Sequence, residues 1–184
     1  MTNSDSFEDE YWEQSAKDLV RAATYGNVNR VRAFLAVGVD TTGVDEFGQT
    51  ALIAAACSSK ERSKAMVEAL LEANSPINHQ DKDGYTALMV AARQGNKDVV
   101  EMLLKRGAEI GIENKQHDTA LTIAERYGNN EIVKILEEAK EKVNAEQKKA
   151  SLKNAIKKAE VKGYGEKSAT SDIAKALRSG NQGM

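Results

Sequence analysis

The sequence repeats itself at intervals of about 33 residues, and this repeat limits what the chain can fold into. The clearest copy, residues 83–108, contains Asp-Gly, Thr-Ala-Leu, Gly-Asn, Leu-Leu and Gly-Ala in that order. Thr-Ala-Leu occurs 36 residues earlier at Thr50 and 33 residues later at Thr119. A weaker copy, residues 22–38, matches residues 91–107 at a constant offset of 69. Units of this length stack on one another, because one unit alone cannot bury its apolar side.

Each copy predicts two short helices. In the clearest copy, Gly84 permits a turn with positive φ, and Thr86 begins the first helix. Gly95 then ends this helix. Apolar residues recur at spacings of three and four between Val99 and Leu104, which predicts an amphipathic second helix.

The period, the two helices and the turn resemble the ankyrin repeat. The family's Thr-Pro-Leu-His signature appears as Thr-Ala-Leu-Ile from Thr50, Thr-Ala-Leu-Met from Thr86 and Thr-Ala-Leu-Thr from Thr119, always without the Pro and the His. The resemblance covers about four repeats, from Asp18 to Ala139. It implies an all-α solenoid of stacked helix–turn–helix units with β-turn fingers.

Charge divides the chain into three parts. Residues 1–14 form an acidic segment, residues 15–139 hold the repeats, and residues 140–184 form a basic helical extension. From Lys140 onward there are 11 Lys or Arg against 5 Asp or Glu, whereas residues 1–18 have 1 Lys against 6 acids. The two ends of the chain therefore carry opposite charges.

The acidic segment also contains the aromatic residues Phe7, Tyr11 and Trp12. One interpretation is a frayed segment whose aromatic side chains pack on the first repeat. The other is an acidic and aromatic segment that docks into a basic groove on a partner.

The last helix is predicted to continue beyond the repeats, because no Gly or Pro occurs between Asn129 and Gly163. The sequence allows one helix of about 30 residues, or two helices with Ser151 capping the second. We expect the extension to cover the open end of the stack. The alternatives are a segment that binds a second partner and a helix that binds nucleic acid. Nucleic acid is the least favoured partner, because acidic residues interrupt the lysines.

Two copies depart from the common pattern. Residues 57–65 are three residues longer than the equivalent stretch after Ala92, and we expect the extra residues in the loop between the two helices. His117 stands where Gly84 stands in the preceding copy. Because His tolerates positive φ better than most non-glycine residues, a formed turn is predicted there.

The sequence offers no arrangement suited to catalysis. It shows no nucleophile–base pattern, no cofactor loop and no metal-ligand spacing around His79 or His117. We therefore expect no enzymatic activity, no cofactor, no metal and no small-molecule substrate. No apolar run is long enough to insert into a membrane, and the acidic start does not have the pattern of a signal peptide. The single cysteine, Cys57, suits a reducing compartment, so a cytoplasmic location is expected, with the nucleus as the alternative.

The resemblance implies that a partner protein binds at the finger tips and on the concave face of the first helices. Tyr85, Arg93, Arg126 and Tyr127 are expected to contribute most, because exposed aromatic and Arg side chains dominate protein interfaces. The predicted partner-binding residues are Tyr25, Glu46, Phe47, Gln49, Lys82, Asp83, Tyr85, Arg93, Gln94, Lys115, Gln116, Asp118, Arg126 and Tyr127. The chain is thus predicted to be an adaptor or scaffold. The alternative is a structural subunit or assembly factor of a larger complex, anchored through residues 140–184.

Overall fold

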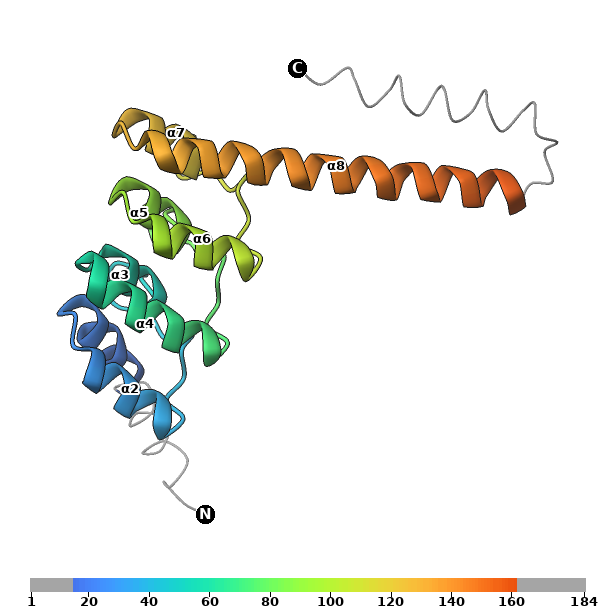
Figure 1. Cartoon of the computed structure of the whole chain (residues 1–184). Helices are drawn as coiled ribbons and strands as arrows, with labels where there is room; N and C mark the ends of the chain where they lie inside the picture. The colour runs from blue at the N-terminus through green and yellow to red at the C-terminus, as the bar shows by residue number, and fades with distance from the viewer. Residues whose placement is uncertain (1–14, 162–184) are drawn as a thin grey trace, which may run out of the picture. The chain divides into compact units, whose positions relative to one another are not determined.

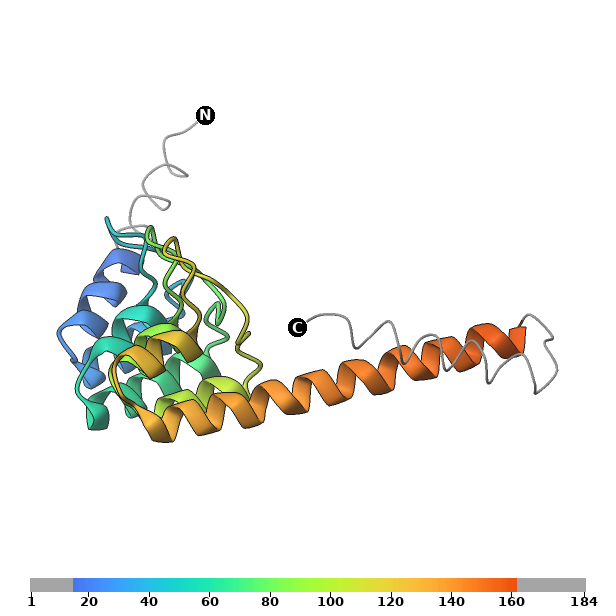
Figure 2. The same cartoon turned by 90° about the horizontal axis from the view of Figure 1, so that it is seen from above.

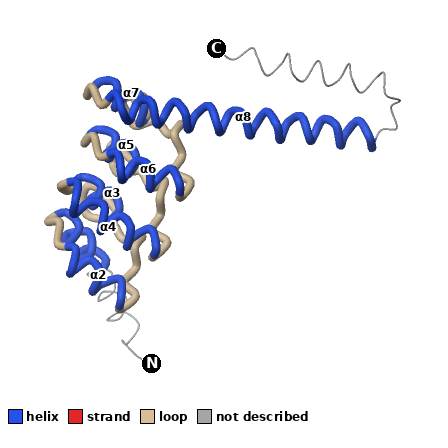
Figure 3. Tube along the Cα trace, viewed as in Figure 1, coloured by secondary structure: helices blue, strands red, loops and turns tan. Residues whose placement is uncertain are grey.

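The computed structural model describes residues 15–161, and the regular structure in this range is helical (Figures 1 and 3). An isolated antiparallel bridge joins Val44 to Thr50. The helices are residues 15–24, α2 (Val28–Ala36), α3 (Ala51–Cys57), α4 (Lys60–Glu72), α5 (Ala87–Arg93), α6 (Lys97–Lys105), α7 (Ala120–Arg126) and α8 (Asn130–Val161). The predicted all-α class is confirmed. None of the helices in residues 15–161 has the length and apolar character needed to cross a membrane.

The chain divides into two compact units, Met1–Glu137 and Glu138–Met184. In the first unit the helices form four successive antiparallel pairs, which are the four repeats in chain order: residues 15–24 with α2, α3 with α4, α5 with α6, and α7 with the start of α8. The first helices pack on one another, α3 on α5 and α5 on α7, while the second helices pack as α2 on α4 and α4 on α6 (Figures 1 and 2). This arrangement is the predicted solenoid of stacked helix–turn–helix units.

Threonine side chains begin the first helix of three pairs. Thr50, Thr86 and Thr119 are the N-cap residues of α3, α5 and α7, and each hydroxyl accepts a hydrogen bond from the backbone N–H three residues later. Such a cap satisfies one of the free N–H groups at a helix start. The Thr-Ala-Leu signature therefore marks the helix starts that the sequence predicted.

The core lies between the layers and is built largely from equivalent positions of the last three repeats. Leu70, Leu103 and Leu136 occupy the same position in their repeats, and each is completely buried. Ala55, Ala91 and Ala124 are also completely buried on the first helices. A leucine buried in this way stabilises the fold by about 2 kcal/mol, whereas the small alanines let neighbouring helices approach closely.

Ion pairs connect equivalent positions of neighbouring second helices. The Nζ atom of Lys64 lies 2.9 Å from Oδ2 of Asp98, and Lys97 pairs in the same way with Glu131. In both pairs the lysine belongs to the earlier helix and the acid to the later one. Both pairs are exposed, so each contributes little to stability.

The prediction that the three extra residues after Cys57 lie in the loop between the two helices is wrong. The connection consists of Ser58 and Ser59, and α4 has 13 residues where α6 has 9. The extra residues extend the start of α4 because Lys60, Glu61 and Arg62 are good helix formers, and an acid in the first turn favours the helix.

The helix α8 continues where the earlier second helices end. Gly107 follows α6 with φ of 86°, whereas Lys140 takes the equivalent position in the last repeat. Without a glycine to adopt the left-handed conformation, the helix continues to Val161 and has 32 residues in all. Ser151 lies inside this helix, so the prediction of one long helix is confirmed and that of a separate second helix is wrong. In the second unit, Val143 and Ile156 are 46% and 39% exposed.

Candidate partner-binding site

Three finger turns share one set of hydrogen bonds. Asp45, Asp81 and Asn114 each accept hydrogen bonds through Oδ1 from the backbone N–H groups two and four residues later, at 2.8–2.9 Å. These three residues recur at the repeat spacing, and this recurrence in the sequence could have identified them as the residues that hold the finger turns. The side-chain acceptors hold each turn in a fixed conformation.

Hydrogen bonds also join each finger to the next. Lys82 donates its backbone N–H to the carbonyl of Phe47, and Lys115 donates to the carbonyl of Asp83, both at 3.0 Å. Gln80 bridges two fingers by donating to the carbonyls of Gly84 and Glu113, each at 2.9 Å. The finger loops therefore form a connected row along one edge of the stack (Figure 2).

Both histidines of the chain lie in the finger loops and contribute to the structure of these loops. Nε2 of His79 lies 2.9 Å from the carbonyl oxygen of Gly48, which ties it to the preceding finger. His117 adopts φ of 61°, which confirms the predicted turn with His in the glycine position. Among residues 15–161, no group of three or more His, Cys, Asp or Glu side chains is placed to hold a metal ion.

Equivalent positions of two repeats carry different side-chain pairs. In the third repeat, the guanidinium of Arg93 stacks over the Tyr85 ring, 5.5 Å from its centroid. In the fourth repeat, Arg126 donates two hydrogen bonds to the carboxylate of Asp118, at 2.6 and 2.5 Å. Each arginine thus reaches back to the residue that precedes the N-cap of its own helix. The guanidinium of Arg93 donates no hydrogen bond to any described residue, whereas that of Arg126 donates two to Asp118.

The predicted site residues differ in exposure. Asp118 is buried and bound to Arg126, and Tyr85 is half-buried under Arg93, although the sequence predicted exposed side chains at both positions. Gln94 donates through Nε2 to the sulfur of Cys57 at 3.5 Å. Gln49 and Arg93 are half-buried. The other predicted residues are exposed: Tyr25, Glu46, Phe47, Lys82, Asp83, Gln94, Lys115, Gln116, Arg126 and Tyr127.

Acid should weaken the fold partly through Asp118. The hydrogen bonds and charge of Arg126 hold the pKa of this carboxyl below its ordinary value of 3.8. The resulting stabilisation is present above pH 3.8 and is lost as the pH falls through the lower pKa of the folded state. We expect Asp118→Asn to flatten this part of the pH dependence of the urea midpoint. Asp83→Asn, at an exposed finger position, is the control and should keep the dependence of the unaltered chain.

Much of the chain matches the model of a known family. The model described as ankyrin repeats, in three copies, matches residues 19–114 and 63–147. A search of curated proteins gave no match. The matched residues cover more than half of the chain and include the helices from α2 to α7, most of the helix over residues 15–24, and the first part of α8.

Proposed function

Because the chain belongs to the ankyrin-repeat family, we propose that it is an adaptor that binds a partner protein with its finger tips and the concave face of its first helices. Ankyrin repeats are generally protein–protein interaction modules. The proposed location is the cytoplasm, which the single Cys57 supports because the chain cannot form an intramolecular disulfide.

The observation that carries this proposal is an exposed aromatic side chain on a fixed finger. Phe47 is 61% exposed, yet its backbone N–H donates to Asp45 and its carbonyl accepts from Lys82. A side chain on a backbone that is already ordered loses less conformational entropy on binding than one on a mobile loop. Phe47 is therefore suited to anchor a partner at the row of fingers.

Side chains farther along the repeats support the same surface. Tyr127 is the C-cap residue of α7 and is 57% exposed. Arg93 lies on Tyr85 with its guanidinium orientation restricted and its donors unused among the described residues. Aromatic and arginine side chains of this kind are enriched at binding hot spots.

A second candidate function is that of a complex subunit anchored through the extension. It is favoured by the exposed Val143 and Ile156 on a helix that is rich in lysine. A helix with exposed apolar side chains and a basic surface suits docking into an acidic groove of another protein.

Binding experiments with variants of the full chain separate these two functions. A partner captured from source-cell lysate with the unaltered chain is identified, and its affinity is measured by calorimetry. We expect the double variant Phe47→Ala and Tyr127→Ala to bind at least about 30-fold more weakly, because truncated hot spots cost about 2 kcal/mol or more. Val37→Ala is the control, since Val37 is 68% exposed but lies outside the predicted set.

The extension is tested with the same partner. The double variant Val143→Ser and Ile156→Ser should bind as tightly as the unaltered chain if the repeats carry recognition. A loss of binding in this variant, together with full binding by the Phe47 and Tyr127 variant, would instead establish the extension as the anchor.

A further inference from the structure

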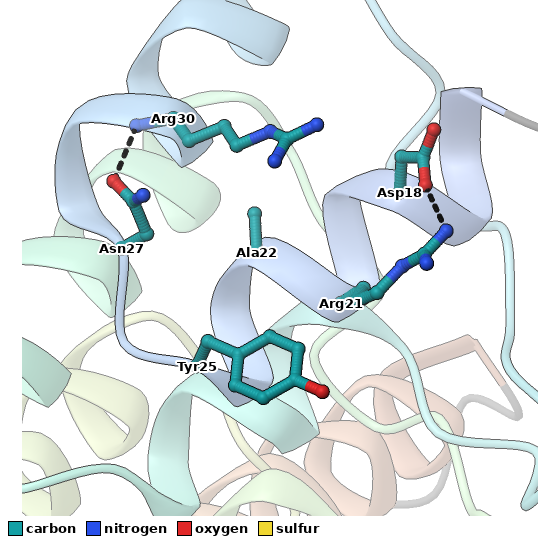
Figure 4. A pocket seen from close by; sticks show the side chains of 6 residues that line it. All are labelled: Asp18, Arg21, Ala22, Tyr25, Asn27 and Arg30. Carbon is teal, nitrogen blue, oxygen red and sulfur yellow. Dashed lines mark hydrogen bonds and ion pairs between the residues drawn. The ribbon is translucent and has the colours of Figure 1, made fainter.

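A pocket of about 330 Å³ opens on the first repeat (Figure 4). Its walls come from the helix over residues 15–24 and from the start of α2. The lining residues are Asp18, Arg21, Ala22, Tyr25, Asn27 and Arg30. None of the residues proposed above to bind a partner lines it, apart from Tyr25.

The pocket occupies a place that is covered in the later repeats. The equivalents of Arg30 are Met66, Val99 and Ile132, and all three are buried. Asp18 likewise corresponds to the buried Ala87 of the third repeat. These positions of a later repeat face the repeat before it, so in the first repeat the pocket lies where a preceding repeat would pack.

The polar side chains of the pocket leave one cation without an acidic partner. Arg21 is paired with Asp18 at 2.5 Å. The guanidinium of Arg30 lies 5.6 Å from the centroid of the Phe34 ring and makes no hydrogen bond or ion pair with the described residues. The side-chain oxygen of Asn27 is already used, because it accepts the backbone N–H of Arg30 at 3.1 Å as the cap of α2. The pocket therefore has an unused set of donors that suits a carboxylate.

We propose that this pocket binds the chain's own acidic and aromatic segment, with Glu8 to Glu10 placing a carboxylate on Arg30 and Phe7 packing on Ala22 and the Tyr25 ring. Residues 1–14 contain five Asp or Glu and no Lys or Arg, which is the charge that the pocket lacks. Tyr25 is 76% exposed and is the one aromatic residue among those that line the pocket.

The segment is long enough to reach this position. Extended chain spans about 3.3 Å per residue, so residue 8 lies within about 23 Å of residue 15. The helix rises only about 10 Å between residues 15 and 22. The reach of the segment is therefore sufficient for residues 7–10 to contact Ala22 if the chain reverses direction before residue 15.

The single tryptophan of the chain, Trp12, lies within the segment and reports on it directly. We expect the fluorescence anisotropy decay of Trp12 in the full chain to contain a slow component with the correlation time of the folded domain. Arg30→Glu should abolish most of this slow component. Arg32→Glu, on the same helix but outside the pocket, is the matched control and should retain it.

Charge exchange tests the direct contact. Combining Arg30→Glu with Glu8→Arg and Asp9→Arg should restore the slow component, and Arg30→Gln should reduce it even if Arg30→Glu disturbs folding. The proposal is overturned if the unaltered chain lacks the slow component, if Arg30→Glu and Arg30→Gln both leave it unchanged, or if Arg32→Glu removes it equally. If Trp12 rotates freely in the unaltered chain, residues 1–14 do not occupy the pocket, and its ligand would have to be another protein.

Discussion

Replacing Leu103 with alanine is expected to lower the free energy of unfolding by about 3 kcal/mol, which is a large part of the stability of a domain of this size. Leu103 is completely buried on α6, which packs on α5 of its own repeat and on α4 of the second repeat. Its removal leaves a cavity. The surrounding helices cannot move in to fill it, because each is fixed by its own buried leucine, Leu70 or Leu136, at the equivalent position. Urea unfolding followed by circular dichroism measures the change.

The neighbouring residue provides the control for this prediction. Leu104 is only half-buried, so Leu104→Ala should cost about 1 kcal/mol. The two adjacent leucines cannot be told apart in the sequence, but the fold buries Leu103 completely and Leu104 only in part. Equal losses for the two variants would contradict the assignment of Leu103 to the core.

Gly84→Ala is expected to cost about 3 kcal/mol, because it combines backbone strain with a collision. Gly84 has φ of 84°, which L-residues rarely adopt. A Cβ atom there would lie 2.9 Å from Cα of Asn114 and 3.0 Å from the backbone N of Lys115. These are backbone atoms of the next finger, and the N–H of Lys115 is held by the carbonyl of Asp83, so the neighbours cannot move aside cheaply.

Gly107→Ala separates the strain from the collision. Gly107 has φ of 86°, but no atom lies within 4 Å of an added Cβ. Its substitution should therefore cost only about 1 kcal/mol, from the backbone conformation alone. The difference between the two midpoints in urea measures how closely the fingers pack. Two equal midpoints would show that the fingers separate without cost.

The fold was predictable because its determinants are local and repeated. Thr86 caps a helix, Gly95 ends it, and the apolar spacing from Val99 defines the next helix, so each copy in the sequence confirmed the others. The extra residues before Ser63 were assigned to the wrong element, because length alone does not distinguish a longer loop from an additional helical turn. Only the helix propensity of Lys60 to Arg62 pointed to the turn.

The site was harder to predict than the fold. The repeat pattern predicts that side chains at the finger tips are exposed, and Phe47 is indeed 61% exposed. The burial of Asp118 does not follow, because it depends on Arg126 reaching back along its own helix to form two hydrogen bonds. The stacking of Arg93 on Tyr85 likewise depends on side-chain conformations that the repeat pattern does not define.

The ion pairs between second helices contribute little to stability, but they have one orientation along the array, with the lysine on the earlier helix and the acid on the later one. Only the third repeat carries both partners, with Asp98 receiving Lys64 and Lys97 meeting Glu131. A tandem duplication of that repeat would reproduce both junctions and lengthen the array without a mismatch. The first repeat has Val28 and Asn29 in place of the lysine and the acid, and the fourth has Asn130 in place of the lysine, so neither would reproduce both pairs. Among the described repeats, the third is therefore the one whose duplication would keep both lysine–acid pairs at every new junction.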